Sequence, residues 1–429
     1  MKKFALGLAL LATISTFSCK KKNEPQVNPG NGNNTEVPTL KPGSIVLTMP
    51  EATAETTEYT FELRISGADI EVTGTTGQED KLDKQNNKYT IYKANAGAKV
   101  VFSGKIKLFH ITAGRIEKAD LSQAPTTLTS FVMRGTQTTA IDLSGATELT
   151  HLVYRDQRTT EIDLSKQNKV VSMELGREVV DNNGIMNKVI MPNPNVVELL
   201  NISDENITDI DLSNLPKLRS LRAFAIKVGK VDLRNSPMLE EVYFTQGSSD
   251  IKYEFFRTKN TPNLFRVFMQ YAPFEEISIE NAPKLGNAGM LSAENTAYIA
   301  NNKLPKIRTG YDRREGLYFN GGGPRKSLVV TGTAITKFIE KTKPESTTLE
   351  VLNLSGNKLV EASLSGLTNI KNIDLSHNAL TEATMNSLAG ELPEMAGATF
   401  KAKEAMAGGV PLPEAIEQAI RAKGWSVMK

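Results

Sequence analysis

The feature that most constrains the fold is a short phrase that recurs along the chain, an apolar residue followed by Asp-Leu-Ser. Its copies contain Asp120, Asp142, Asp163, Asp211 and Asp374, and a near copy with arginine in place of serine contains Asp232. Neighbouring copies are repeatedly 21 or 22 residues apart. A fixed spacing of this size is typical of stacked repeats, in which each unit buries its apolar face against the next. The sequence therefore predicts a repeat solenoid.

The most regular repeats lie near the C-terminus. Two segments, Leu349 to Leu359 and Ile370 to Leu380, match the leucine-rich repeat pattern L-x-x-L-x-L-x-x-N-x-L and begin 21 residues apart. Their leucines and isoleucines are expected to fill a shared core. Asn357 and Asn378 are expected to turn their amides inward and to satisfy backbone groups in the bend, where no strand partner exists.

The rest of the chain divides by composition and by period. Looser L-x-x-L pairs begin at residues 128, 149, 170, 218, 239 and 264, and residues 286–326 break the period. Within that break, residues 291–305 resemble residues 380–393, and both segments predict a helix that closes a stack. The predicted organisation is a lipoprotein signal peptide (1–18), a flexible tether (19–44), a small β domain or N-terminal cap (45–112), array one with a helical terminator (113–326), array two (327–400) and a C-terminal cap (401–429). Whether the two arrays form one solenoid stays open at this point.

Both ends carry capping signals. In residues 59–65 apolar and polar side chains alternate, as they do in a half-buried strand, and similar short runs follow up to residue 102. Residues 413–423 predict a helix, with Gly424 suited to the left-handed position after it and Trp425 packing back onto it. The fold class is therefore mainly β with few helices, covered at both ends.

The first residues indicate export. Lys2 and Lys3 precede an apolar run that is too short to span a bilayer, and the run Thr16-Phe17-Ser18-Cys19 resembles the relaxed bacterial lipobox seen in Bacteroidetes. The resemblance implies cleavage before Cys19 and lipidation of that residue, which would hold the protein on a membrane. The alternative is a secreted protein whose leader is cut near Ser18.

Composition argues against several classes of function. The net charge is +3, or about +1 without the two leader lysines, so no strong field attracts nucleic acid. Cys19 is the single cysteine, which excludes an internal disulfide framework. The three histidines lie in different repeat regions, and no metalloprotease, nucleophile-elbow or phosphate-loop motif occurs. We expect no enzyme activity, no cofactor and no metal.

The candidate binding residues face outward between the apolar residues of the array-one strands. The proposed ligand-binding set is Arg222, Phe224, Tyr243, Phe268 and Arg155, because aromatic side chains beside arginine are typical of binding hot spots. Adjacent strands about 4.8 Å apart would bring such side chains into one patch. The competing interpretation is a register shifted by one residue, which would bury the aromatics in the core.

The column of repeated aspartates is a second candidate. Stacked carboxylates could bind cations, or each aspartate could accept hydrogen bonds from backbone N–H groups at a turn. The second interpretation is favoured, because the glycine-rich spacing of calcium-binding β-rolls is absent.

Taken together, the repeats, the lipobox, the leading β segment and the Gly-Trp ending resemble leucine-rich repeat surface lipoproteins of Bacteroidetes, in the style of BspA-like and internalin-like proteins. The resemblance implies an outer-membrane, lipid-anchored protein displayed at the cell surface, used in adhesion or host contact and often antigenic. It carries over no catalytic residue and no particular ligand. The leading hypothesis is binding of an extracellular protein or glycan through a concave sheet. The alternative is a structural or envelope-assembly role in which the array binds another surface component of the same bacterium.

Overall fold

The structure is a computed structural model, and it describes residues 41–155, 157–177, 185–203, 206–246, 253–270, 274–285, 317–320, 326–339 and 348–429. Residues 40–429 form one compact unit, distinct from residues 1–39. The signal peptide, Cys19, nearly all of the tether and the helix expected at residues 291–305 lie outside the described residues.

The N-terminal segment folds into five antiparallel strands. They are β1 (Ser44–Thr48), β2 (Glu58–Thr73), β3 (Gly77–Leu82), β4 (Lys88–Asn95) and β5 (Lys99–Gly114). β5 pairs antiparallel with β1 and β2, and its C-terminal half pairs in parallel with β7 of the first repeat. The small β segment is therefore continuous with the solenoid, and its strands cover the first turn.

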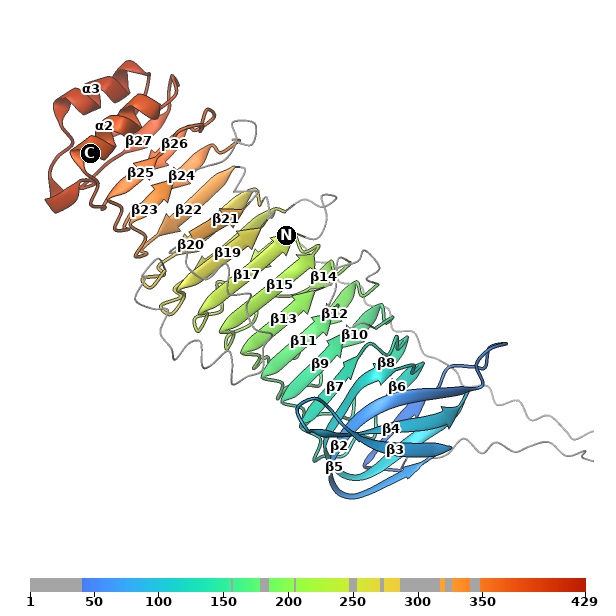
Figure 1. The fold of residues 1–429 in the computed structure, drawn as a ribbon. Helices are drawn as coiled ribbons and strands as arrows, with labels where there is room; N and C mark the ends of the chain where they lie inside the picture. The colour runs from blue at the N-terminus through green and yellow to red at the C-terminus, as the bar shows by residue number, and fades with distance from the viewer. Residues whose placement is uncertain are drawn as a thin grey trace, which may run out of the picture. The chain divides into compact units, whose positions relative to one another are not determined.

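One row of parallel strands, here called ladder 1, runs from β5 along array one (Figure 1). Its further members are β7 (Ser130–Arg134), β9 (His151–Arg155), β11 (Ser172–Gly176), β13 (Leu199–Ser203), β15 (Ser220–Ile226), β17 (Glu241–Gln246), β19 (Arg266–Gln270) and β21 (Leu317–Asn320). Each strand pairs with the strand one turn away.

The alternate strands form a second row, here called ladder 2, and the Asp-Leu-Ser phrases lie at some of its strands. The members are β6 (Lys118–Asp120), β8 (Ala140–Asp142), β10 (Glu161–Asp163), β12 (Lys188–Ile190), β14 (Asp209–Ile210), β16 (Lys230–Asp232), β18 (Phe255–Lys259), β20 (Glu276–Glu280), β22 (Ser327–Thr331), β24 (Val351–Asn353), β26 (Asn372–Asp374), β27 (Thr399–Lys401) and β28 (Ser426–Met428). Hydrogen bonds group them as β6–β8, β10–β12–β14 and β16 to β28. After β21, two strands alternate in the sequence with those of ladder 2. They are β23 (Lys337–Ile339) and β25 (Glu361–Ser363), and they pair with each other.

The two arrays belong to one solenoid. β20 of array one pairs with β22 of array two from Glu276 opposite Ser327 to Glu280 opposite Thr331. β22 then pairs with β24, so ladder 2 continues across the segment where the period breaks. The predicted fold class, a mainly β leucine-rich repeat solenoid with few helices, is confirmed.

Alternate residues of each strand point into the core that the two ladders enclose. In β20, for example, Ile277 and Ile279 are fully buried, whereas Glu276 is exposed. At the N-terminal end the core is aromatic, because the rings of Phe102 and Phe109 lie 5.0 Å apart and Phe109 stacks on Phe131 of the first repeat at 6.2 Å. These contacts join the core of the β segment to that of the solenoid.

The leucine-rich pattern changes ladder along the chain. In array one the L-x-x-L residues belong to ladder 1, for example Leu149 and Leu152 at β9. In array two the same pattern belongs to ladder 2, as Leu349 and Leu352 at β24 show. The phrase at Asp374 consequently occupies a different place in its repeat from the phrase at Asp142, although both lie in ladder 2.

Buried amide side chains satisfy the backbone where the chain bends. Asn357 accepts bonds from the backbone N and the hydroxyl of Thr333 at 2.9 and 2.6 Å, and donates to the carbonyls of Val330 and Leu354 at 2.7 and 2.8 Å. Asn378 makes the corresponding bonds one turn later, to the carbonyls of Leu354 and Leu375 and from the backbone N of Leu359. Each amide therefore links two consecutive turns.

Gln157 makes corresponding contacts in array one, where the leucine-rich pattern is looser. It lies eight positions after Leu149, as Asn357 does after Leu349. Its carbonyl oxygen accepts from the hydroxyl of Thr136 and the backbone N of Thr138, both at 2.8 Å. Glutamine thus fills a position at which the repeat pattern specifies asparagine.

α2 (Glu382–Glu391) lies at the end of array two, and the C-terminal cap contains a short 3-10 turn (Ala407–Gly409) and α3 (Glu414–Ala422). Thr381 caps α2 by accepting the backbone N of Thr384. α2 does not end the stack as expected, since β26 pairs with β27 and β27 with β28. Gly424 adopts a φ of 89° after α3, and Trp425, 2% exposed, donates to the carbonyl of Pro393 at 2.8 Å. None of the helices in the described residues is long and apolar enough to cross a membrane.

We predict that Asn357→Ala will lower the free energy of unfolding by about 3 kcal/mol, because it leaves several buried backbone groups without a partner. Asn372→Ala, which changes an exposed asparagine of β26, is the matched control and should cost less than about 0.5 kcal/mol. Urea unfolding followed by circular dichroism measures both. Equal midpoints for the two variants would contradict the role given to Asn357.

Candidate functional site

The outer face of ladder 1 carries a central row of side chains in register across the repeats. Strand pairing aligns Glu174 with Asn201, Asn201 with Arg222, Arg222 with Tyr243, and Tyr243 with Phe268. Leu221, Val242 and Val267, the residues just before the last three, point into the core and are fully buried. The register that places the aromatics outside is therefore the one observed, and the shifted register is excluded.

Three of the predicted residues meet in one cluster. The rings of Tyr243 and Phe268 lie 5.8 Å apart at an angle of 38°. The guanidinium of Arg222 lies 5.5 Å from the centre of the Tyr243 ring, and that of Arg266 lies 5.7 Å from it. Arg266 also donates to the Tyr243 hydroxyl. Two guanidinium groups beside one ring fix its orientation by cation–π attraction and hydrogen bonding.

Burial distinguishes the members of this cluster. Phe224, Tyr243 and Phe268 are half-buried, whereas Arg222 is only 4% exposed. Burial is the main cause that raises the pKa of Tyr243 above its usual value, so the hydroxyl stays protonated at physiological pH. Phe224 lies in the neighbouring outward row, where it pairs with Thr245. The aromatic side chains, rather than Arg222, therefore supply the accessible surface of the site.

Glu241 holds the arginines of the cluster in place. Its carboxylate accepts from the Ser220 hydroxyl at 2.8 Å and from Arg222 at 3.2 Å, and it lies 4.0 Å from Arg266. The side chain is 3% exposed, so these pairs are shielded from solvent. Glu241 was not predicted, although it lies two residues before Tyr243 and alternate residues of a strand share a face.

Arg155 does not join the aromatic cluster. It lies on β9, three strands from Arg222, or about 14 Å away at the usual strand spacing. It is 7% exposed and pairs with Glu174 at 3.4 Å, and Arg134 pairs with the same carboxylate oxygen at 3.2 Å. Arg155 therefore belongs to a separate ion-pair group, and its predicted part in ligand binding stays a prediction.

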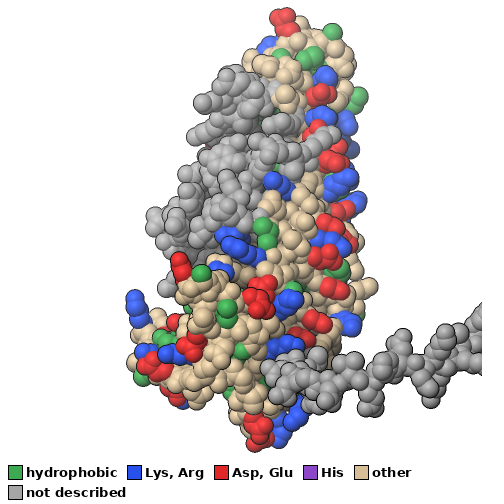
Figure 2. Space-filling model, turned by 90° about the vertical axis from the view of Figure 1, so that its right-hand side faces the viewer, with side chains coloured by type: hydrophobic (Ala, Val, Ile, Leu, Met, Phe, Trp, Pro, Cys, Tyr) green, Lys and Arg blue, Asp and Glu red, His purple; other side chains and the backbone are tan. Residues whose placement is uncertain are grey.

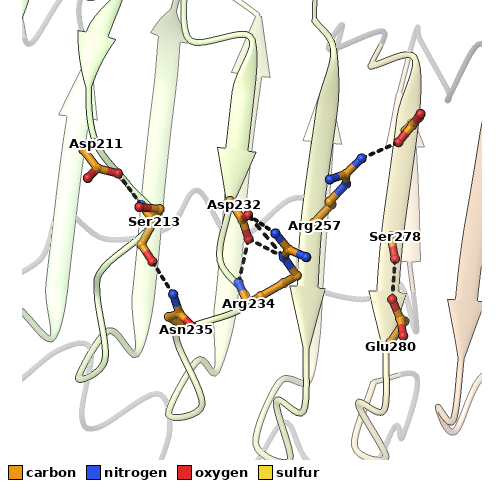
Figure 3. Close-up of polar contacts among 9 residues, drawn as sticks. Asp211, Ser213, Asp232, Arg234, Asn235, Arg257, Ser278 and Glu280 are labelled. Carbon is orange, nitrogen blue, oxygen red and sulfur yellow. Dashed lines mark hydrogen bonds and ion pairs between the residues drawn. The ribbon is translucent and has the colours of Figure 1, made fainter. Parts of the chain in front are cut away.

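The repeated aspartates on ladder 2 act in turns. Figure 3 shows Asp211 accepting the backbone N of Ser213 at 2.8 Å, and Asp232 bound to Arg234. Asp120, Asp142, Asp163 and Asp374 accept the backbone N two residues later at 2.8 to 3.0 Å. In β24 an asparagine, Asn353, makes the same bond at 3.0 Å. The position therefore requires an acceptor rather than a charge, and the described residues contain no group of side chains suited to a metal ion.

Ion pairs between consecutive turns place positive and negative side chains next to each other on the surface. Lys188 pairs with Glu161, Arg257 with Glu276 and Lys371 with Glu350, at 2.7 to 3.1 Å. Figure 2 shows positive and negative side chains alternating along one side of the molecule. This arrangement gives no broad field of one sign on that side, and exposed pairs of this kind contribute little stability individually.

No family model matches the sequence, and no curated protein matches it. Among solved structures, the functional domain of InlJ from Listeria monocytogenes, which includes a cysteine ladder, aligns over 67% of this chain at 15% identity and a TM-score of 0.23. The chain covers 58% of that domain. The leucine-rich repeat domain of APL1B aligns over 71% of this chain and 82% of its own, at 13% identity and a TM-score of 0.28.

Asp232 differs from the other repeat aspartates because it adds an ion pair with Arg234 to the backbone bond, and the charge can be tested there. Its hydrogen bonds with Arg234 are the main cause that lowers its pKa, so its contribution to stability is present above the unfolded-state pKa and is lost as pH falls through the lower folded-state value. Asp232→Asn keeps an acceptor but loses the charge, and should cost about 1 kcal/mol at pH 7 and less at an acidic pH below the unfolded-state pKa.

Urea unfolding at both pH values measures the difference. Asp232→Ala, which removes the acceptor as well, should cost more than Asp232→Asn at pH 7, and Asp209→Asn, at an exposed position of β14, is the control. A penalty for Asp232→Asn that does not change with pH would reject the role of the carboxylate charge.

Proposed function

We propose that this protein is a lipid-anchored, surface-displayed leucine-rich repeat protein that binds an extracellular macromolecule through the outer face of ladder 1. Its role on this proposal is non-enzymatic adhesion or host contact at the outer membrane. The observation that carries the proposal is the alignment of Arg222, Tyr243 and Phe268 on three adjacent strands.

The cluster has the composition and the rigidity of a binding surface. Tyrosine and arginine are enriched at binding hot spots, and half-buried aromatic rings offer a large contact area at little cost in conformational entropy. The Glu241 ion pairs and the ring contacts hold these side chains before a partner arrives. Little binding energy is then lost in ordering them.

The anchoring part of the proposal depends on the sequence around Cys19, which lies outside the described residues. A basic start, a short apolar run and a single cysteine directly after it fit processing by the lipoprotein pathway. On the side seen in Figure 2 positive and negative side chains are interspersed, which fits a protein that stays soluble beside the membrane.

The first test uses the full chain with Cys19→Ser, probed on arrays of extracellular proteins and glycans. The triple variant Phe224→Ala, Tyr243→Ala and Phe268→Ala should weaken binding of the detected ligand about 100-fold, since it removes the exposed hot-spot area. Surface plasmon resonance gives the dissociation constants.

Phe255→Ala is the matched control. Phe255 is a half-buried aromatic on the outer face of β18, with the guanidinium of Arg257 4.2 Å from its ring centre, but it lies on ladder 2. Its removal should leave affinity unchanged. Equal affinity of the triple variant and the parent would reject the patch, and binding only to components of the same bacterium would favour an envelope-assembly role.

The second test concerns the anchor. Cys19→Ser should abolish incorporation of labelled palmitate and release the protein from the membrane fraction, because a leader without the cysteine offers no acylation site. Protease added to intact cells should degrade the parent protein. Palmitate labelling that survives the substitution would contradict lipidation at Cys19, and complete protection from protease would contradict surface display.

A further inference from the structure

The last strand of ladder 2, β28, has one edge that no other strand of the described residues covers. It pairs with β27 alone. The backbone N of Ser426 donates to the carbonyl of Ala398 at 2.8 Å, and the carbonyl of Met428 accepts from the backbone N of Ala402 at 2.9 Å. Residues of a strand direct their backbone groups alternately to its two sides. The N–H and C=O groups of Val427, between these two residues, therefore point to the free edge.

Such an edge is a template for another strand, because its backbone groups can bond to a second chain. The first turn of ladder 2 presents no such edge, since β1 pairs with both β5 and β6. Proline or charged side chains within an edge strand usually prevent strand addition, but β28 contains neither. Its outward Met428 is 51% exposed. Protection of this edge must therefore come from outside the strand.

A side chain of α3 reaches this edge. The Nη2 of Arg421 donates to the carbonyl of Val427 at 3.1 Å. Glu417, one turn earlier in α3, accepts from the Nε and Nη2 of Arg421 at 3.0 and 2.9 Å, and it also pairs with Lys429 directly after β28. The Glu417 side chain is 14% exposed, whereas about half of the Arg421 side chain is in contact with water. The carboxylate thus holds the guanidinium against the free edge of β28.

We propose that Arg421 prevents β28 from pairing with β28 of a second copy of this chain. Two copies in antiparallel orientation would place Val427 opposite its counterpart, and a hydrogen-bonded pair of this kind exchanges both N–H···O=C bonds. The same surface would serve on both chains, as a two-fold interface requires. The guanidinium takes the carbonyl that the second copy would use, and it places a charge in the path of the incoming strand. This inference is independent of the ligand of ladder 1.

The first variant is Arg421→Ala in the full Cys19→Ser chain, studied by sedimentation equilibrium. It should dimerise at a concentration about tenfold lower than the parent, because the hydrogen bond to the Val427 carbonyl becomes available to the second copy. Gln418→Ala is the matched control. Gln418 is an exposed residue of α3 that bonds to Glu414 within the helix, so its removal should leave the parent's behaviour unchanged.

A second variant, Arg421→Ala with Val427→Pro, tests whether association uses the edge itself. Proline removes the N–H that points to the free edge and no bond to β27, so it should reverse the dimerisation. The melting temperature of Arg421→Ala should stay within about 2 °C of the parent, since half-exposed ion pairs contribute little stability.

Dimerisation that the proline reverses, at an unchanged melting temperature of Arg421→Ala, supports the proposal. Three results would overturn it. Arg421→Ala remains as monomeric as the parent, or it dimerises equally well with Val427→Pro, or it associates only together with a lower melting temperature. The last result would assign Arg421 to the stability of the cap alone.

Discussion

The structure depends on the pairing of each turn with the next. A repeat of about 21 residues cannot enclose its own leucines, so its apolar side chains leave water only when neighbouring turns stack against it. Both ladders serve this purpose, and ladder 2 keeps its pairing from β20 to β22 across the break in the sequence period. The same constraint explains the ends. The aromatic contacts through Phe102 and Phe109 cover the first turn, and α3 with the buried Trp425 accompanies the last strands.

The bends between strands impose a second constraint, because their backbone N–H and C=O groups lack strand partners. Amide side chains on the inner side of the bends satisfy backbone groups there, namely those of Asn357, Asn378 and Gln157. On the outer side, the Asp-Leu-Ser aspartates accept a backbone N–H two residues later. The phrase that first revealed the repeat is therefore structural. The outward side chains of ladder 1 do not satisfy backbone groups in the bends. Function is therefore proposed on this face.

Much of the fold could be predicted because it depends on spacing. The repeat length, the outward register of Tyr243 and Phe268, the strands near residues 59–65 and the cap around Trp425 all follow from periodicity or local chemistry. Other features depend on three-dimensional pairing. The transfer of the leucine pattern from ladder 1 to ladder 2 is invisible in sequence, because both ladders accept the same alternation of apolar residues. Gln157 occupies a position at which the repeat pattern specifies asparagine, and the distance of Arg155 from Tyr243 depends on the number of intervening strands, which the sequence does not show.

The central claim is that ladder 1, and not ladder 2, meets the partner. Amide hydrogen exchange of the full Cys19→Ser chain, with and without the strongest ligand from the protein and glycan arrays, tests it without any substitution in the face. The account predicts slower exchange, on ligand binding, in peptides covering β15, β17 and β19, and unchanged exchange in peptides covering β24 and β26. Protection confined to β24 and β26 would contradict it.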